Sequence, residues 1–83
     1  MPDYYETIYN KGNIYLKEKN YKLAAEFYKK IISTNNEFIP AFNNLALVYY
    51  YQADYVMALK ILKRVIKSGQ FYNLQFYYSL IGK

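Results

Sequence analysis

The sequence predicts an all-α fold: a right-handed α-solenoid of two antiparallel helix hairpins followed by a C-terminal helix. Apolar residues recur at the three- and four-residue spacing of a helix, and the second half of the chain repeats the first at an offset of 34 residues. Short polar segments, KEKN and QAD, interrupt the apolar pattern. The 83 residues are expected to form one domain, 1–83, with repeat one at about 5–38, repeat two at about 39–72 and a terminal helix at about 71–82.

The first hairpin is predicted from helices at about 3–18 and 21–34. The segment KEKN between them is short, and a short connection makes two consecutive helices antiparallel neighbours. The first hairpin should therefore pack one helix directly against the other.

The second hairpin is predicted from helices at about 39–52 and 55–68. Strict alternation of apolar and polar residues fails across NNLALVYYY, so a strand is not expected there. Asp54 can cap the second of these helices, and Ser68-Gly69 can end it. Its apolar residues share one helical stripe, made of Ala58, Ile61, Leu62 and Val65.

The internal repeat needs no gap. Identical residues recur 34 positions apart, as the pairs Asn10/Asn44, Tyr15/Tyr49, Tyr21/Tyr55, Ala24/Ala58, Lys29/Lys63 and Ile32/Ile66. A fixed period of this length is typical of stacked helical repeats.

The two copies resemble the tetratricopeptide repeat family, whose pattern sets a large residue, small residues, a tyrosine and an aromatic within 34 residues. The second copy matches at Phe42, Leu45, Ala46, Tyr49, Ala58 and Leu62, and the first at Ile8, Gly12, Tyr15, Ala24 and Tyr28. The resemblance implies a scaffold for protein–protein interaction, in which the first helix of each repeat lines a concave groove.

The matched positions also suggest how each hairpin packs. Gly12 is expected to face Ala24, and Ala46 to face Ala58, because small residues on both helices let the backbones come close. Tyr15 and Tyr49 are expected to wedge into the space beside them.

Carried onto this chain, the groove of the family would bind a protein or peptide segment. Two of its residues leave alternatives open: Tyr50 and Tyr51 either pack between repeats or contact a ligand, since tyrosine offers a large rigid surface with a polar tip. The expected groove residues are Tyr9, Asn13, Leu16, Lys17, Asn43, Asn44, Leu47, Tyr50 and Tyr51.

Some members of the family hold the C-terminal carboxylate of chaperones with two asparagines and three basic residues. Asn13 and Asn44 match the asparagines, but the basic positions hold Tyr9, Phe76 and Leu80. Binding of chaperone tails in this mode is therefore not expected.

Catalysis is not expected. The chain has no histidine and no cysteine, the side chains that most often act as general base, nucleophile or transition-metal ligand. The six Asp and Glu residues are scattered, and the three glycines form no phosphate-binding loop. We expect no enzyme activity, no metal and no cofactor.

Nucleic-acid binding is the alternative function, although less favoured. The net charge is +5, and four cations share one helical face that lies opposite the apolar stripe of 55–68: Lys60, Lys63, Arg64 and Lys67. The competing interpretation is a solvated outer face.

The predicted terminal helix is too apolar for a solvent-exposed cap of a repeat array. A second copy, a swapped helix or further repeats of a longer array should cover it, and we expect a homo-oligomer. The residues concerned are Phe71, Tyr72, Leu74, Phe76, Tyr77, Tyr78, Leu80 and Ile81. The sequence shows neither a signal peptide nor a membrane-spanning segment, so a cytoplasmic location is expected.

Overall fold

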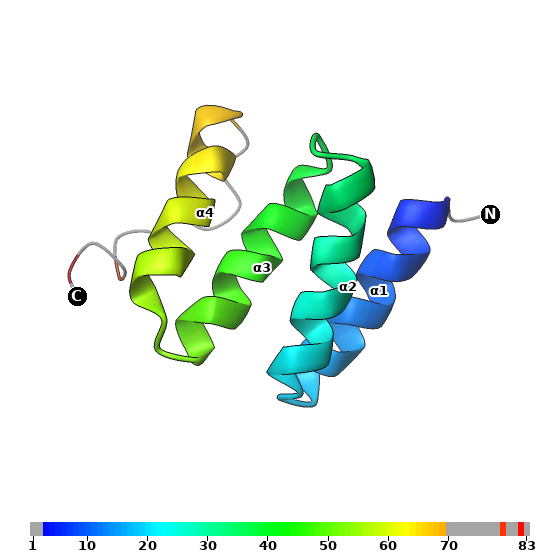
Figure 1. Cartoon of the computed structure of the whole chain (residues 1–83), viewed down its shortest axis with the longest axis horizontal. Helices are drawn as coiled ribbons and strands as arrows, with labels where there is room; N and C mark the ends of the chain where they lie inside the picture. The colour runs from blue at the N-terminus through cyan, green and yellow to red at the C-terminus, as the bar shows by residue number, and fades with distance from the viewer. Residues whose placement is uncertain (1–2, 70–78, 80–81, 83) are drawn as a thin grey trace.

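The computed structural model describes residues 3–69, 79 and 82, and these confirm the all-α fold. Its four helices are α1 (Tyr4–Lys17), α2 (Tyr21–Thr34), α3 (Ile39–Tyr51) and α4 (Tyr55–Lys67). They follow one another across the molecule as two antiparallel hairpins (Figure 1). Of the predicted terminal helix at about 71–82, all but Ser79 and Gly82 lies outside the described residues.

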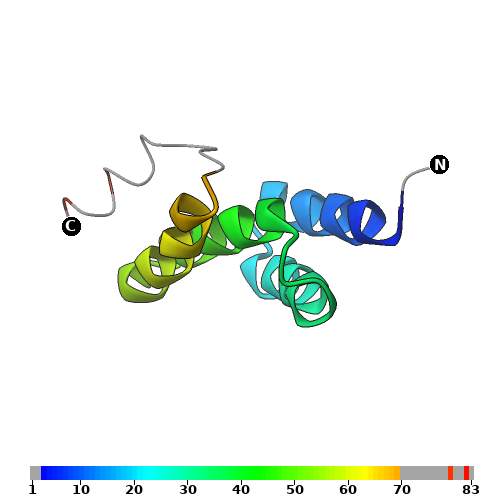
Figure 2. The ribbon, with the colours of Figure 1, turned by 90° about the horizontal axis from the view of Figure 1, so that it is seen from above.

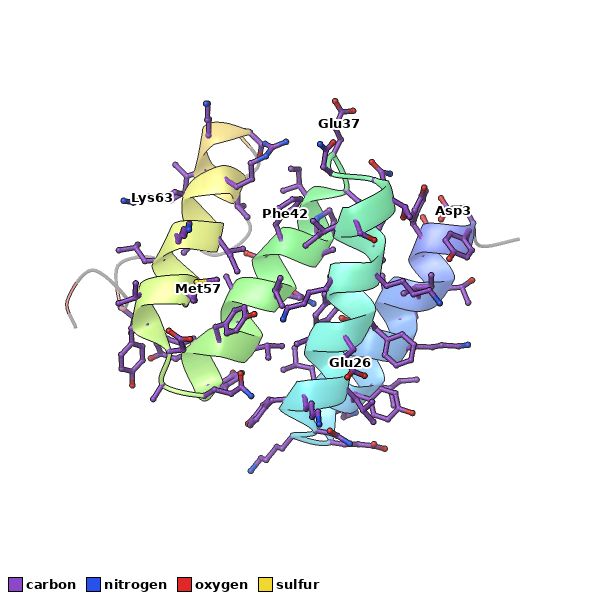
Figure 3. The ribbon with its side chains drawn as sticks, viewed as in Figure 1. Asp3, Glu26, Glu37, Phe42, Met57 and Lys63 are labelled. Carbon is purple, nitrogen blue, oxygen red and sulfur yellow. The ribbon has the colours of Figure 1, made fainter. Side chains whose placement is uncertain are left out.

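Side chains cap three of the four helices as the sequence requires. Asp3 Oδ1 accepts a hydrogen bond from the backbone N–H of Glu6 at 2.7 Å, at the beginning of α1 (Figure 3). Asp54 accepts one from the N–H of Met57 at 3.3 Å, which confirms its predicted role at the start of α4. Each such bond satisfies one of the N–H groups that a helix leaves unpaired at its first turn.

The two hairpin turns have the same backbone geometry. Lys19 and Ala53, 34 positions apart, both adopt the left-handed conformation, with φ of 63° and 61°. The next residue of each turn donates its N–H five residues back, Asn20 to the Tyr15 carbonyl and Asp54 to the Tyr49 carbonyl, both at 2.9 Å. This closure is the Schellman motif, so the repeat seen in the sequence is also a repeat of the turn.

Helix α3 packs on both sides and joins the hairpins. Its residues Ala41, Leu45 and Val48 lie in a buried cluster with α1 and α2, whereas Ile39 and Ala46 lie in a second cluster with α4. In Figure 2, α1 and α3 lie in one layer and α2 below them. The face that α1 and α3 share is therefore the face on which a groove can form.

The contact at Gly12 differs from the expected one. A Cβ atom added at Gly12 would lie 2.7 Å from Cε1 of Tyr28, so the closest neighbour is this ring and not Ala24. Tyr28 has no exposed surface and is the largest fully buried side chain among the described residues. Ala24, Ala46 and Ala58 are also fully buried, which agrees with the expected close packing of the two helices in each hairpin.

Tyr15 and Tyr49 are only half-buried, so neither is an enclosed wedge. Tyr15 stacks on Phe27 of α2, with ring centroids 5.5 Å apart and planes 7° apart. Tyr49 packs against both buried clusters, not within its own hairpin alone, and the Lys29 ammonium lies 5.6 Å from its ring centroid.

Candidate peptide-binding groove

A hollow of about 430 Å³ opens where α1, the first turn, α2 and α3 meet. Its volume is in the range of small-molecule binding sites, and it is open to the outside. Its lining residues are Asn13, Leu16, Lys17, Lys19, Tyr21, Leu47 and Tyr51. We call this hollow the concave groove.

The structure brings five of the nine expected groove residues into this lining: Asn13, Leu16, Lys17, Leu47 and Tyr51. The others, Tyr9, Asn43, Asn44 and Tyr50, do not line it. Two lining residues were not among those expected, Lys19 and Tyr21. Lys19 enters because the left-handed turn places it beside the end of α1, and a turn conformation of this kind gives little signal in a sequence.

A polar cluster lies beneath the groove and links the hairpins. Asn44 Nδ2 of α3 donates to Asn13 Oδ1 of α1 at 2.8 Å and approaches the hydroxyls of Tyr9 at 3.1 Å and Tyr28 at 3.4 Å. The Tyr28 hydroxyl itself donates to Asn13 Oδ1. The two asparagines that match the chaperone-binding members therefore bond to each other, and only Asn13 also reaches the groove.

Burial raises the pKa of the Tyr28 hydroxyl to about 12, against an ordinary value of 10.0. The Asn44 side chain opposes this shift by hydrogen bonding, and the charge of Tyr9 adds to it. The hydroxyl is thus held in its neutral, donating form, which keeps Asn13 Oδ1 occupied.

Asn43 lies beside the cluster and donates from Nδ2 to Asn44 Oδ1 at 3.1 Å. Its own Oδ1 is buried and has no donor within the described part of the chain. Asn43 therefore contributes one hydrogen bond to the cluster while it buries one unsatisfied acceptor.

The three consecutive tyrosines take separate places. Tyr50 lies against Tyr55, with ring centroids 5.6 Å apart, and its hydroxyl lies 3.1 Å from Ser79 Oγ. Tyr51 is 54% exposed and stacks on Tyr21 across the groove, with centroids 5.8 Å apart. Of the three consecutive tyrosines, only Tyr51 lines the groove.

The charges at the groove are of one sign. Lys17 and Lys19 are the charged residues of the lining, and no carboxylate belongs to it. Glu18, between them in sequence, lines a different hollow of about 330 Å³ with Lys11, Tyr15 and Phe27. At the end of α1, Lys17 and Lys19 therefore lie at the groove, whereas Glu18 lies outside it.

The basic stripe of α4 is less continuous than the sequence indicated. Lys60, Lys63 and Lys67 are exposed, and Lys63 points away from α3 (Figure 3). Arg64, however, is half-buried: it donates to the Asn36 carbonyl at 3.2 Å and lies 5.5 Å from the Phe42 ring centroid. The expectation that all four cations face solvent together is therefore wrong for Arg64, which is turned toward α3.

Comparison with known families agrees with the resemblance. Two tetratricopeptide repeat models match, one over residues 5–38 and the other over residues 41–69. The chain belongs to the tetratricopeptide repeat family. A search of curated proteins gives no match.

Tetratricopeptide repeats are generally protein–protein interaction modules on a non-catalytic scaffold, so this tetratricopeptide repeat chain has protein partners. Among the described helices none has the length and apolarity needed to cross a membrane.

Proposed function

We propose that this tetratricopeptide repeat protein binds an extended peptide segment of a partner protein in the concave groove. One observation carries the proposal: an open hollow combines a stacked tyrosine pair, the half-buried Tyr21 and the exposed Tyr51, with the apolar side chains Leu16 and Leu47 and the amide of Asn13. Tyrosine is enriched at interface positions that dominate binding energy, because it brings large rigid area and a polar tip.

The experiment compares two exposed tyrosines. Peptides are selected from a phage-displayed random library on the wild-type protein, and the enriched peptides are synthesised with a fluorophore. Their affinities are then measured by fluorescence anisotropy for the wild type, for Tyr51→Ala and for Tyr4→Ala. Tyr4 is a matched control, since it is 58% exposed and lies outside the groove lining.

Tyr51→Ala is expected to weaken binding by about 1–2 kcal/mol, the loss typical of a residue important to an interface. Tyr4→Ala should leave the affinity unchanged. A library that yields no binding peptide, or an equal loss for both variants, contradicts the proposal.

A second part of the proposal is self-association through the apolar residues of 71–81. Its support is the sequence, since these residues lie outside the described part of the chain. Light scattering at several concentrations tests it, and a monomer at every concentration contradicts it.

The function proposed is binding without catalysis. Nucleic-acid binding remains the less favoured alternative. The Arg64 guanidinium contacts the Asn36 carbonyl and the Phe42 ring. It therefore does not face the same side as the exposed lysines of α4 and would not share a nucleic-acid phosphate with them. If the wild type binds RNA and the double variant Lys60→Gln/Lys63→Gln does not, this alternative is favoured.

A further inference from the structure

We infer that the segment bound in the concave groove is acidic, and that its carboxylates meet Lys17, Lys19 and the amide nitrogen of Asn13. The inference rests on the proposed function and adds the chemistry of the peptide to it. It is based on the polar side-chain groups of the groove lining that have no hydrogen-bond partner in the described part of the chain.

Asn13 offers donors only. Its Oδ1 already accepts hydrogen bonds from the Tyr28 hydroxyl and from Asn44 Nδ2. No donor bond from Asn13 Nδ2 is found within the residues that the structure describes. Because an amide nitrogen can only donate, what remains at Asn13 is suited to an oxygen of the bound segment.

The two lysines of the lining, Lys17 and Lys19, also favour an oxygen ligand. An ammonium group has three donors and no acceptor, and neither Lys17 nor Lys19 forms an ion pair in the described part of the chain. Apart from the tyrosine hydroxyls, which can act both ways, every polar side chain in the lining is therefore a donor. A segment with carboxylates satisfies such a lining, whereas a basic segment would meet two like charges.

These lysines are not the basic positions of the chaperone-binding members, which here hold Tyr9, Phe76 and Leu80. The acid recognition inferred here therefore shares Asn13 with those members but takes its positive charge from other positions, Lys17 at the end of α1 and Lys19 in the turn. The apolar side chains of Leu16 and Leu47, with the rings of Tyr21 and Tyr51, form the rest of the lining. They suit an apolar or aromatic side chain next to the acidic ones. The net charge of +5 would also attract an acidic partner from a distance.

The test uses the random peptide library on three forms of the full chain: the wild type, Lys17→Gln/Lys19→Gln and Lys60→Gln/Lys63→Gln. The two double variants lose the same charge, and Lys60 and Lys63 are exposed on α4 away from the groove. Circular dichroism checks that each variant is folded. Enriched peptides are then measured by fluorescence anisotropy, each beside a version with Glu and Asp replaced by Gln and Asn.

Peptides selected on the wild type should be rich in Asp and Glu. Their affinity should fall roughly 2- to 30-fold with Lys17→Gln/Lys19→Gln, the range given by two partly exposed charge pairs. The loss should be smaller at high salt and should be absent with Lys60→Gln/Lys63→Gln.

Neutral or basic peptides that lose affinity with Tyr51→Ala would overturn the inference and leave the proposed function standing. Acidic peptides that bind Lys17→Gln/Lys19→Gln as tightly as the wild type would overturn it as well. A single-stranded oligouridine RNA serves as a further probe. If it binds the wild type and is lost with Lys17→Gln/Lys19→Gln while no peptide is selected, both the inference and the proposed function are wrong.

Discussion

The substitution Gly12→Ala tests the closest contact of the fold. The added Cβ would lie 2.7, 3.0 and 3.1 Å from Cε1, Cζ and Cδ1 of Tyr28. The ring has no exposed surface, and its hydroxyl is bonded to Asn13, so it has little room to move away. Overpacking of this kind costs about 1–3 kcal/mol, whereas the better helix propensity of alanine returns about 1 kcal/mol.

We therefore expect Gly12→Ala to lower the free energy of unfolding by up to about 2 kcal/mol. Urea unfolding followed by far-UV circular dichroism measures it. Asn10→Ala is a control in the same helix, because Asn10 is exposed and the change improves helix propensity alone. It should be neutral or slightly stabilising.

The cause is tested by repeating Gly12→Ala in a Tyr28→Leu background, where the ring is absent. There the same substitution should become neutral or stabilising. The reasoning is refuted if Gly12→Ala stabilises the wild type, or if its cost is the same with and without the ring.

Five further substitutions probe the polar cluster and the tyrosines. Burial raises the pKa of Tyr28 from 10.0 to about 12, so the stability that its neutral hydroxyl contributes is complete below pH 10 and is lost as the pH rises to about 12. The full loss is about 3 kcal/mol. Wild type should therefore lose more stability than Tyr28→Phe between pH 9.5 and 11.5 in urea titrations, and parallel losses would contradict this. Asn44→Leu should cost about 1–2 kcal/mol because it breaks the bonds between hairpins, whereas Asn43→Leu should be near neutral because it also removes a buried acceptor without a donor. Tyr49→Ala should cost about 2 kcal/mol, less than a fully buried aromatic, and Tyr51→Ala under about 0.5 kcal/mol; equal thermal shifts for the two would show that their burial is misassigned.

The sequence predicted the helices well because their signals are local. Apolar spacing gave the four helices, and Asp54 and Gly69 marked the beginning and end of the last one. The pairing of helices into hairpins followed from the short turns between them, because a short turn leaves few alternative arrangements. The fixed offset showed that the same hairpin occurs twice.

The groove was predictable only in part, because its lining depends on where helices meet in space. Asn13, Leu16 and Leu47 could be assigned through the family pattern, whereas Lys19 enters the lining only through its left-handed turn. The burial of Tyr28 was also hidden: its position matched the family, but nothing in the sequence showed that its ring would lie against Gly12. Arg64 fell on the polar side of the helical pattern, and a long side chain can still turn back to a neighbouring helix.

The double-sided packing of α3 has a consequence for cooperativity. Removing the second hairpin would strip Ala41, Leu45 and Val48 from the cluster that encloses Tyr28, and would leave that ring open to water. The first hairpin is therefore expected to depend on the second, so the slowest amide protons of α1 and α2 should exchange only when α3 also opens.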